Sequence, residues 1–163
     1  MTEDCHCPTE AGAPTCDRSS SRRTEAKACP TCNRHGKRID TLTLKALLAL
    51  SLTQIRAVEY RFCAARDCST VYYSADHLQR FAEDVLRERV FQKHADDGDA
   101  LVCYCFRHTV RAIKDQPRGV GRNRILDSIT AAIQAGQCAC DIRNPQGSCC
   151  LGNVRAVLAD RNG

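Results

Sequence analysis

The chain has 163 residues, of which 13 are cysteine, and it carries a formal net charge of +5 with only 5% aromatic residues. This length suits one ordinary domain or two small ones, and small domains with few large side chains need reinforcement. The chain has no apolar run near the roughly 20 residues of a membrane span, and its polar start lacks the apolar stretch of a signal peptide. We therefore expect no membrane segment and a cytoplasmic location.

The high cysteine content indicates metal sites. Cytosolic thiols stay reduced, so closely spaced cysteines there are more often metal ligands than disulfides. Thirteen is also an odd number, so the thiols cannot all pair within one chain.

All of the excess positive charge lies in the last third. Residues 101–163 hold nine Lys and Arg but four Asp and Glu, whereas residues 1–100 are balanced. A basic region can bind phosphate, but it can also offset a buried metal–thiolate centre of negative charge. The basic residues are dispersed along the sequence, so we favour the second interpretation and do not expect nucleic-acid binding.

Residues 1–28 predict a disordered tail. They are rich in Ser and Pro and show no apolar periodicity. The tail carries Cys5-His6-Cys7 and Cys16, a set of donors that suits soft ions such as Cu⁺. Ordering a flexible tail around a metal is costly, which favours the alternative that these thiols are incidental.

Residues 29–95 predict a first compact unit. The apolar pattern predicts a helix over Thr41–Leu52, and alternation predicts strands over Glu59–Cys63 and Ser69–Tyr73. The turn between the strands places Cys63 and Cys68 at facing ends of a hairpin. Residues 76–93 suit a helix or a strand equally, and the acidic, turn-rich residues 95–99 mark a domain boundary.

Residues 96–163 predict a second unit that is helical in outline. The expected elements are a short amphipathic segment over 108–114, a helix over Arg124–Ala135 ended by Gly136, a turn at Asn144-Pro145-Gln146-Gly147, and a last helix capped by Asn153.

Four cysteines of the first unit have the spacing of a structural zinc site. Cys29 and Cys32 are separated by two residues, and Cys63 and Cys68 by four. Structural Zn²⁺ takes four ligands in a tetrahedron from two such short loops, and metal binding then supplies folding free energy. A complete set of four thiolates leaves no position for water, so this site predicts stability rather than hydrolytic chemistry.

Six cysteines of the second unit have different spacings. They are Cys103 and Cys105, Cys138 and Cys140, and the adjacent pair Cys149 and Cys150. A spacing of one residue is unusual for zinc, while a 2Fe–2S cluster shares four thiolates between two irons. A Cys-x-Cys loop can give both thiolates to one iron while a distant pair serves the other. The spacing alone leaves zinc and a cluster open.

The order of these motifs resembles the N-terminal part of CopZ-type copper chaperones. The resemblance rests on Cys29-Pro30-Thr31-Cys32, on Phe62-Cys63 through Cys68 with Val71-Tyr72-Tyr73, on Val102-Cys103-Tyr104-Cys105, and on the run from Cys140 through Asn144-Pro145-Gln146-Gly147 to Cys149-Cys150. It covers about residues 29–160. That part of the family joins a zinc unit to a 2Fe–2S unit similar to bacterioferritin-associated ferredoxin.

The resemblance implies the ligands. It assigns zinc to Cys29, Cys32, Cys63 and Cys68, and a 2Fe–2S cluster to Cys103, Cys105, Cys140 and either Cys149 or Cys150, of which we choose Cys150 because Val154 then matches the start of the ferredoxin-like helix. Cys138 is a spare thiol or a rival to Cys140. The expected fold is α+β, with a small zinc-ribbon-like hairpin unit followed by a small helical 2Fe–2S-binding unit.

The resemblance also has a gap. The family continues into a heavy-metal-associated domain with a Gly-Met-x-Cys-x-x-Cys copper loop, which these 163 residues do not contain. We therefore expect not copper delivery but one-electron transfer in copper or heavy-metal handling, with Cu²⁺ reduction as the one reaction it could support. The expected partners are a copper chaperone or copper-transporting ATPase and an electron donor.

Two alternatives belong to other classes. One is a soft-metal buffer or chaperone that binds Cu⁺ or Hg²⁺ through the tail cysteines. The other is a double-zinc interaction module. None of the three is an enzyme by itself, since the sequence shows no catalytic constellation of Ser, His and acid or of paired carboxylates.

Overall fold

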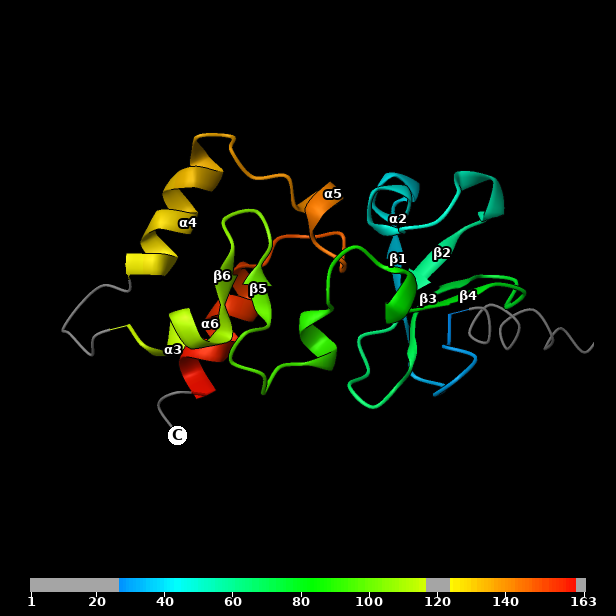
Figure 1. Ribbon diagram of the computed structural model, residues 1–163, viewed down its shortest axis with the longest axis horizontal. Helices are drawn as coiled ribbons and strands as arrows, with labels where there is room; N and C mark the ends of the chain where they lie inside the picture. Colours follow the sequence, from blue (N-terminus) through cyan, green and yellow to red (C-terminus); the bar gives the residue numbers. More distant parts are fainter. Residues whose placement is uncertain (1–26, 117–123, 161–163) are drawn as a thin grey trace, which may run out of the picture.

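The computed structural model describes residues 27–116 and 124–160, which form two small units side by side (Figure 1). The tail with Cys5, His6, Cys7 and Cys16 lies outside the described residues. Within the described part of the chain, no helix is long and apolar enough to cross a membrane.

The first unit is built on an antiparallel sheet of four strands in the order β1-β2-β3-β4. The strands are β1 (Lys37–Ile39), β2 (Tyr60–Phe62), β3 (Thr70–Ser74) and β4 (Arg80–Ala82), accompanied by helix α2 (Thr41–Leu47) and the short 3-10 turns η1 (Leu52–Gln54) and η2 (Glu83–Val85). The predicted β2–β3 hairpin is confirmed, and the sheet is larger than the zinc-ribbon-like hairpin that the sequence predicted.

The helix α2 is shorter than predicted. The Asp40 side chain accepts a hydrogen bond from the Leu42 N–H and so caps its start. The helix ends at Leu47 because Leu48 adopts an extended conformation and forms a bridge with Leu86. Leu48 thereby enters the core of the first unit. Beyond α2, Leu48 is buried and Leu50 is partly buried by tertiary packing, whereas Leu52 is exposed, so the apolar pattern up to Leu52 did not mark more helix.

Strand β3 is buried along its whole length and divides the first unit into two small cores. Tyr72 belongs to the core beneath α2, together with Leu44 and Phe62. Tyr73 lies on the other side, where it packs with the cysteines of the first quartet. Residues next to each other in β3 therefore serve different parts of the molecule.

The second unit holds a separate core. Its elements are η3 (Phe91–Lys93), the hairpin β5 (Leu101–Cys103) and β6 (His108–Thr109), and the helices α3 (Val110–Lys114), α4 (Arg124–Gln134), α5 (Cys140–Arg143) and α6 (Leu151–Asp160). The core draws on Val102, Ile113, Ile129 and Val154, and it includes Cys103 and Cys150. The predicted helix after Arg124 is confirmed, and Gly136 follows it with a φ of 70°.

The second unit differs from the expectation in two ways. The β5–β6 hairpin was not predicted, because its strands are too short to show periodicity. Asn153 is not the cap of the last helix, since α6 begins at Leu151. The Asn153 side chain instead donates to the Gln146 Oε1 at 3.1 Å and so ties α6 to the preceding turn.

The two units are docked through α5 and the turn that follows it. Helix α5 lies against α2 (Figure 1), and the Tyr72 hydroxyl donates to the Pro145 carbonyl at 2.7 Å. The turn closes with a hydrogen bond from the Gly147 N–H to the Asn144 carbonyl, which confirms the predicted turn. Both α5 and this turn therefore contact the first unit.

Gly147 lies in the contact between the two units. Its φ is 61°, and a Cβ there would lie 2.6 Å from the Ile39 Cδ1. We expect Gly147→Ala to lower the free energy of unfolding by roughly 2–4 kcal/mol through left-handed strain and overpacking. Gly136→Ala is the control, because its φ is 70° but no atom lies within 4 Å. Equal losses in calorimetry would show that the close approach is unimportant.

Candidate metal centres

The first four thiols converge on one point. The Sγ atoms of Cys29, Cys32, Cys63 and Cys68 all lie within 4.8 Å of one another. The Cys29 and Cys68 sulfurs are 3.8 Å apart, and the Cys32 and Cys63 sulfurs are 3.6 Å apart. A tetrahedral zinc ion with Zn–S bonds of about 2.3 Å requires sulfurs about 3.8 Å apart, so the donor set and its geometry fit zinc.

Local backbone geometry turns the sulfurs inward. Backbone N–H groups of Arg34, Ala65 and Thr70 donate to the sulfurs of Cys32, Cys63 and Cys68, respectively. On the first loop, the Asn33 N–H also donates to the Cys29 carbonyl, and Asn33 has a φ of 58°. Each donated N–H stabilises a sulfur that carries negative charge, as in a metal thiolate.

The proton balance of this site follows from burial. Burial raises the pKa of Cys63 to about 12 and also raises the pKa of Cys68. Burial acts the same way on Cys32, but the Arg34 N–H and the neighbouring thiols outweigh it and lower the pKa of that thiol. Without metal, Cys63 is protonated at neutral pH, so zinc binding releases its proton and the affinity rises with pH.

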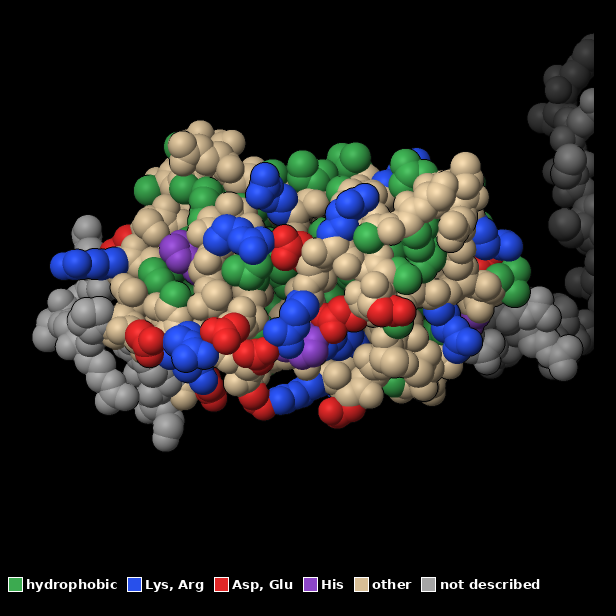
Figure 2. All heavy atoms as spheres, in the orientation of Figure 1, with side chains coloured by type: hydrophobic (Ala, Val, Ile, Leu, Met, Phe, Trp, Pro, Cys, Tyr) green, Lys and Arg blue, Asp and Glu red, His purple; other side chains and the backbone are tan. Residues whose placement is uncertain are grey.

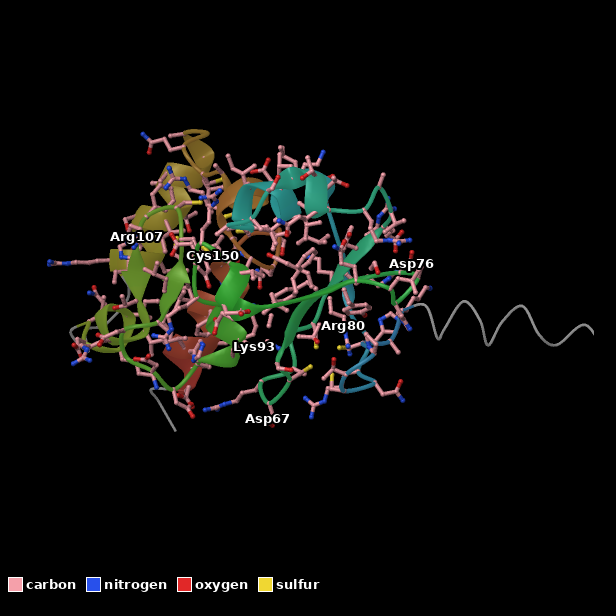
Figure 3. The ribbon with its side chains drawn as sticks, turned by 45° about the vertical axis from the view of Figure 1, so that its right-hand side comes forward. Asp67, Asp76, Arg80, Lys93, Arg107 and Cys150 are labelled. Atoms are coloured by element: carbon pink, nitrogen blue, oxygen red, sulfur yellow. The ribbon has the colours of Figure 1, made fainter. Side chains whose placement is uncertain are left out.

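Lys93 supplies a positive charge beside this site from the start of the second unit. Its Nζ donates to the carbonyls of Ala65, Cys68 and Thr70 at 2.6, 2.8 and 3.0 Å. Figure 3 shows Lys93 between the two units, near the turn that carries Asp67. The ammonium group thus fastens the second cysteine loop and offsets part of the negative charge of four thiolates.

We expect Lys93→Met to speed zinc release. Hydrogen bonds from a charged group contribute about 1.5–3 kcal/mol each, so the loss of this anchor should accelerate release by at least about tenfold. Transfer of zinc to a coloured chelator measures the rate. Lys45→Met, on the exposed side of α2, is the matched control and should leave the rate unchanged. A Lys93→Met rate equal to that of the control would contradict this role.

The second group of thiols forms two pairs rather than one compact set. The Cys105 and Cys140 sulfurs are 3.7 Å apart, and the buried Cys103 and Cys150 thiols lie close enough to shift each other's pKa. The structure therefore pairs cysteines across the two loops, not within the Cys-x-Cys loop. Among the described residues, no other group of three or more donor atoms is as compact as the first quartet.

Backbone N–H groups also point at these sulfurs. Ala139 donates to the Cys105 Sγ at 3.3 Å, and the Cys150 N–H donates to the Cys140 sulfur. The Cys150 thiol lowers the pKa of Cys103 to about 7, assisted by the N–H groups of Phe106 and Cys105. The bond to Cys103 and burial raise the pKa of Cys150. Burial raises the pKa of Cys140 to about 12 in spite of the Cys150 N–H. Without metal, Cys140 and Cys150 therefore keep their protons, and metal binding at this group releases them.

The remaining two thiols lie at the edge of this arrangement. Cys149 is exposed, whereas Cys150 beside it is only 1% exposed. Cys138 is half-buried and makes no described sulfur contact like that between Cys105 and Cys140. Of the cysteines between which the resemblance left a choice, Cys150 is buried and Cys140 lies beside Cys105, whereas Cys149 is exposed.

The comparisons agree with the first site. Residues 26–87 match the model of the family zf_CopZ, described as a zinc binding domain. They contain all four cysteines of the compact quartet. This part of the chain is therefore similar to a CopZ-type zinc-binding domain.

A likeness to a solved structure extends over both units. The chain is similar to the X-ray structure of the Archaeoglobus fulgidus CopZ N-terminal domain, with 28% identity and a TM-score of 0.65. The alignment covers 80% of this chain and 96% of that one. Comparison with curated proteins gives no match.

Proposed function

We propose that this protein is a one-electron transfer protein in copper handling, with structural zinc in the first unit and a 2Fe–2S cluster in the second. The observation that carries the proposal is the pairing of Cys105 with Cys140 and of Cys103 with Cys150, each pair suited to one iron. The likeness to the CopZ N-terminal domain over both units supports it. When bound, the cluster supplies reversible one-electron chemistry.

The residues of the second unit fit this role in three ways. The four paired thiols match the donor set of such a cluster. N–H groups of Ala139, Phe106 and Cys150 donate to the sulfurs and stabilise negative charge there, which favours the reduced state. The apolar core around Cys103 and Cys150 excludes water from one side.

The exposure of the ligands indicates where electrons enter. Cys103 and Cys150 are 0% and 1% exposed, whereas Cys105 and Cys140 are half-buried. The Cys105–Cys140 pair therefore lies nearest to solvent and to any partner. Arg107, two residues beyond Cys105, forms an ion pair with Glu88 at 2.8 Å, so Glu88 offsets its positive charge at this edge.

Several further assignments belong to the same proposal. The protein is not an enzyme by itself, although reduction of Cu²⁺ to Cu⁺ is compatible with one-electron transfer. Its partners are an electron donor and a copper chaperone or copper-transporting ATPase, and its location is cytoplasmic. On the face in Figure 2, Lys and Arg side chains are interspersed with Asp and Glu, an arrangement that does not favour nucleic-acid binding.

Anaerobic purification with metal analysis and a visible spectrum tests the proposal. We expect two iron and one zinc per chain, with absorbance between about 400 and 550 nm that bleaches on reduction by dithionite. A colourless protein with two zinc ions would instead establish the double-zinc module. If deletion of residues 1–28 abolished Cu⁺ or Hg²⁺ binding in a protein without iron, the soft-metal buffer would replace it.

A further inference from the structure

The loop that carries Cys140 and Cys150 is held by the zinc unit. The Tyr72 hydroxyl donates to the Pro145 carbonyl at 2.7 Å in a fully buried contact. The Thr43 hydroxyl donates to the Asp141 carbonyl. Both donors belong to the first unit, and both acceptors lie between the two cysteines along the chain.

The fit around this loop leaves little freedom. A Cβ at Gly147 would lie 2.6 Å from the Ile39 Cδ1 and 3.3 Å from the Thr43 Oγ1, so the Ile39 side chain would have to shift to accommodate it. Within the loop, the Asn144 side chain donates to the Ser148 carbonyl at 2.7 Å. Asn144 is 1% exposed, so the loop is buried between the units where it turns. The position of the loop therefore depends on contacts with the first unit as much as on contacts within the second unit.

The other cysteine loop is anchored at the junction of the units. Tyr104 lies between Cys103 and Cys105, and its hydroxyl donates to the Arg89 carbonyl at 2.7 Å. The same hydroxyl accepts from the Phe91 N–H at 2.9 Å. Both loops that carry the second thiol group are therefore hydrogen-bonded to residues that precede the β5–β6 hairpin in the sequence.

Zinc binding is connected to Tyr72 through strand β3. The strand starts at Thr70, two residues after Cys68, and the Cys63 N–H donates to the Val71 carbonyl at 2.8 Å. A zinc ion that joins Cys63 and Cys68 therefore closes the hairpin that presents the Tyr72 hydroxyl. Lys93 links the same loop to η3, directly after the anchor points of Tyr104.

We propose that Tyr72 is a positioning residue through which the zinc unit holds the second thiol group in its metal-binding arrangement. The inference extends the proposed function, because it makes structural zinc a condition for the geometry of the second centre. The two centres are therefore coupled, because zinc in the first centre restricts the motion of Cys140 and Cys150. Loss of the Tyr72 hydroxyl weakens this restriction but leaves the zinc site intact.

The test compares Tyr72→Phe with Tyr73→Phe in the full chain. The Tyr73 hydroxyl donates to the Lys27 carbonyl within the first unit, so the control removes a hydroxyl from the same strand without touching the loop. In zinc-loaded, iron-free protein, alkylation of Cys140 and Cys150 followed by mass spectrometry measures how often the loop opens. We expect about tenfold faster alkylation in Tyr72→Phe, because its Pro145 carbonyl loses a buried donor, and no change in the control.

A second readout uses iron-loaded protein. The visible circular dichroism of the cluster should change in Tyr72→Phe but not in Tyr73→Phe, while both retain one zinc per chain. Equal alkylation rates in the wild type and Tyr72→Phe would overturn the inference. If the wild type takes up no iron, the proposed function fails, and the alkylation rates still decide this inference. If Tyr72→Phe loses zinc, Thr43→Val, which removes the other donor, takes its place with the same expected result.

Discussion

Replacing Cys63 by serine should remove zinc and unfold the first unit. The four sulfurs hold loops 31 residues apart in the sequence, from Cys32 to Cys63, and the cores around them are small. Structural zinc contributes about 10–16 kcal/mol in small domains, which is comparable to the whole stability of about 5–15 kcal/mol of an ordinary protein. Far-ultraviolet circular dichroism and zinc content by native mass spectrometry measure both effects.

The control for this experiment is Cys149→Ser. Cys149 is exposed, and no residue of the first quartet depends on it. It should keep one zinc per chain and the circular dichroism of the wild type. A Cys63→Ser protein that stays folded without zinc would show that the sheet and the core beneath α2 stabilise the unit by themselves. The coupling between the two centres would then have to run through packing alone.

The sequence predicts the thiol pattern well because metal ligands are constrained locally. Two short loops with fixed spacing, one at the turn of a hairpin, are sufficient to indicate that Cys63 and Cys68 face Cys29 and Cys32. The long helix α4 is predicted for a similar reason, since its apolar residues recur on one face and Gly136 ends it. In each case the signal lies within one short stretch of chain.

The sequence does not predict how the two units meet, because that depends on contacts between distant residues. Pro145 lies in a predicted turn, but nothing near it indicates that Tyr72 donates to its carbonyl. The sequence around Lys93 likewise gives no indication that its ammonium group binds the Cys68 loop. That contact follows from the position of η3 beside the loop. The pairing of Cys105 with Cys140 likewise follows from packing, not from spacing.

The largest effect in the second unit should come from Cys150→Ser. Cys150 is buried against Cys103, and its own N–H donates to the Cys140 sulfur, so it contributes to both thiol pairs. We expect the variant to lose the iron-dependent visible absorbance completely while it retains one zinc per chain. Absorbance per chain and iron content after anaerobic reconstitution measure the loss.

The adjacent Cys149 makes this a matched comparison, because Cys149→Ser removes the same group one residue away. The exposed Cys149 thiol should be dispensable, so that variant should keep two irons and the spectrum of the wild type. A second matched pair is Cys140→Ser and Cys138→Ser. We expect Cys140→Ser to lose the iron because it breaks the 3.7 Å pair with Cys105, and Cys138→Ser to keep the spectrum of the wild type. If Cys149→Ser bleaches the protein and Cys150→Ser does not, the loop must turn by one residue when metal binds. The Pro145 contact with Tyr72 would then be a feature of the metal-free chain only.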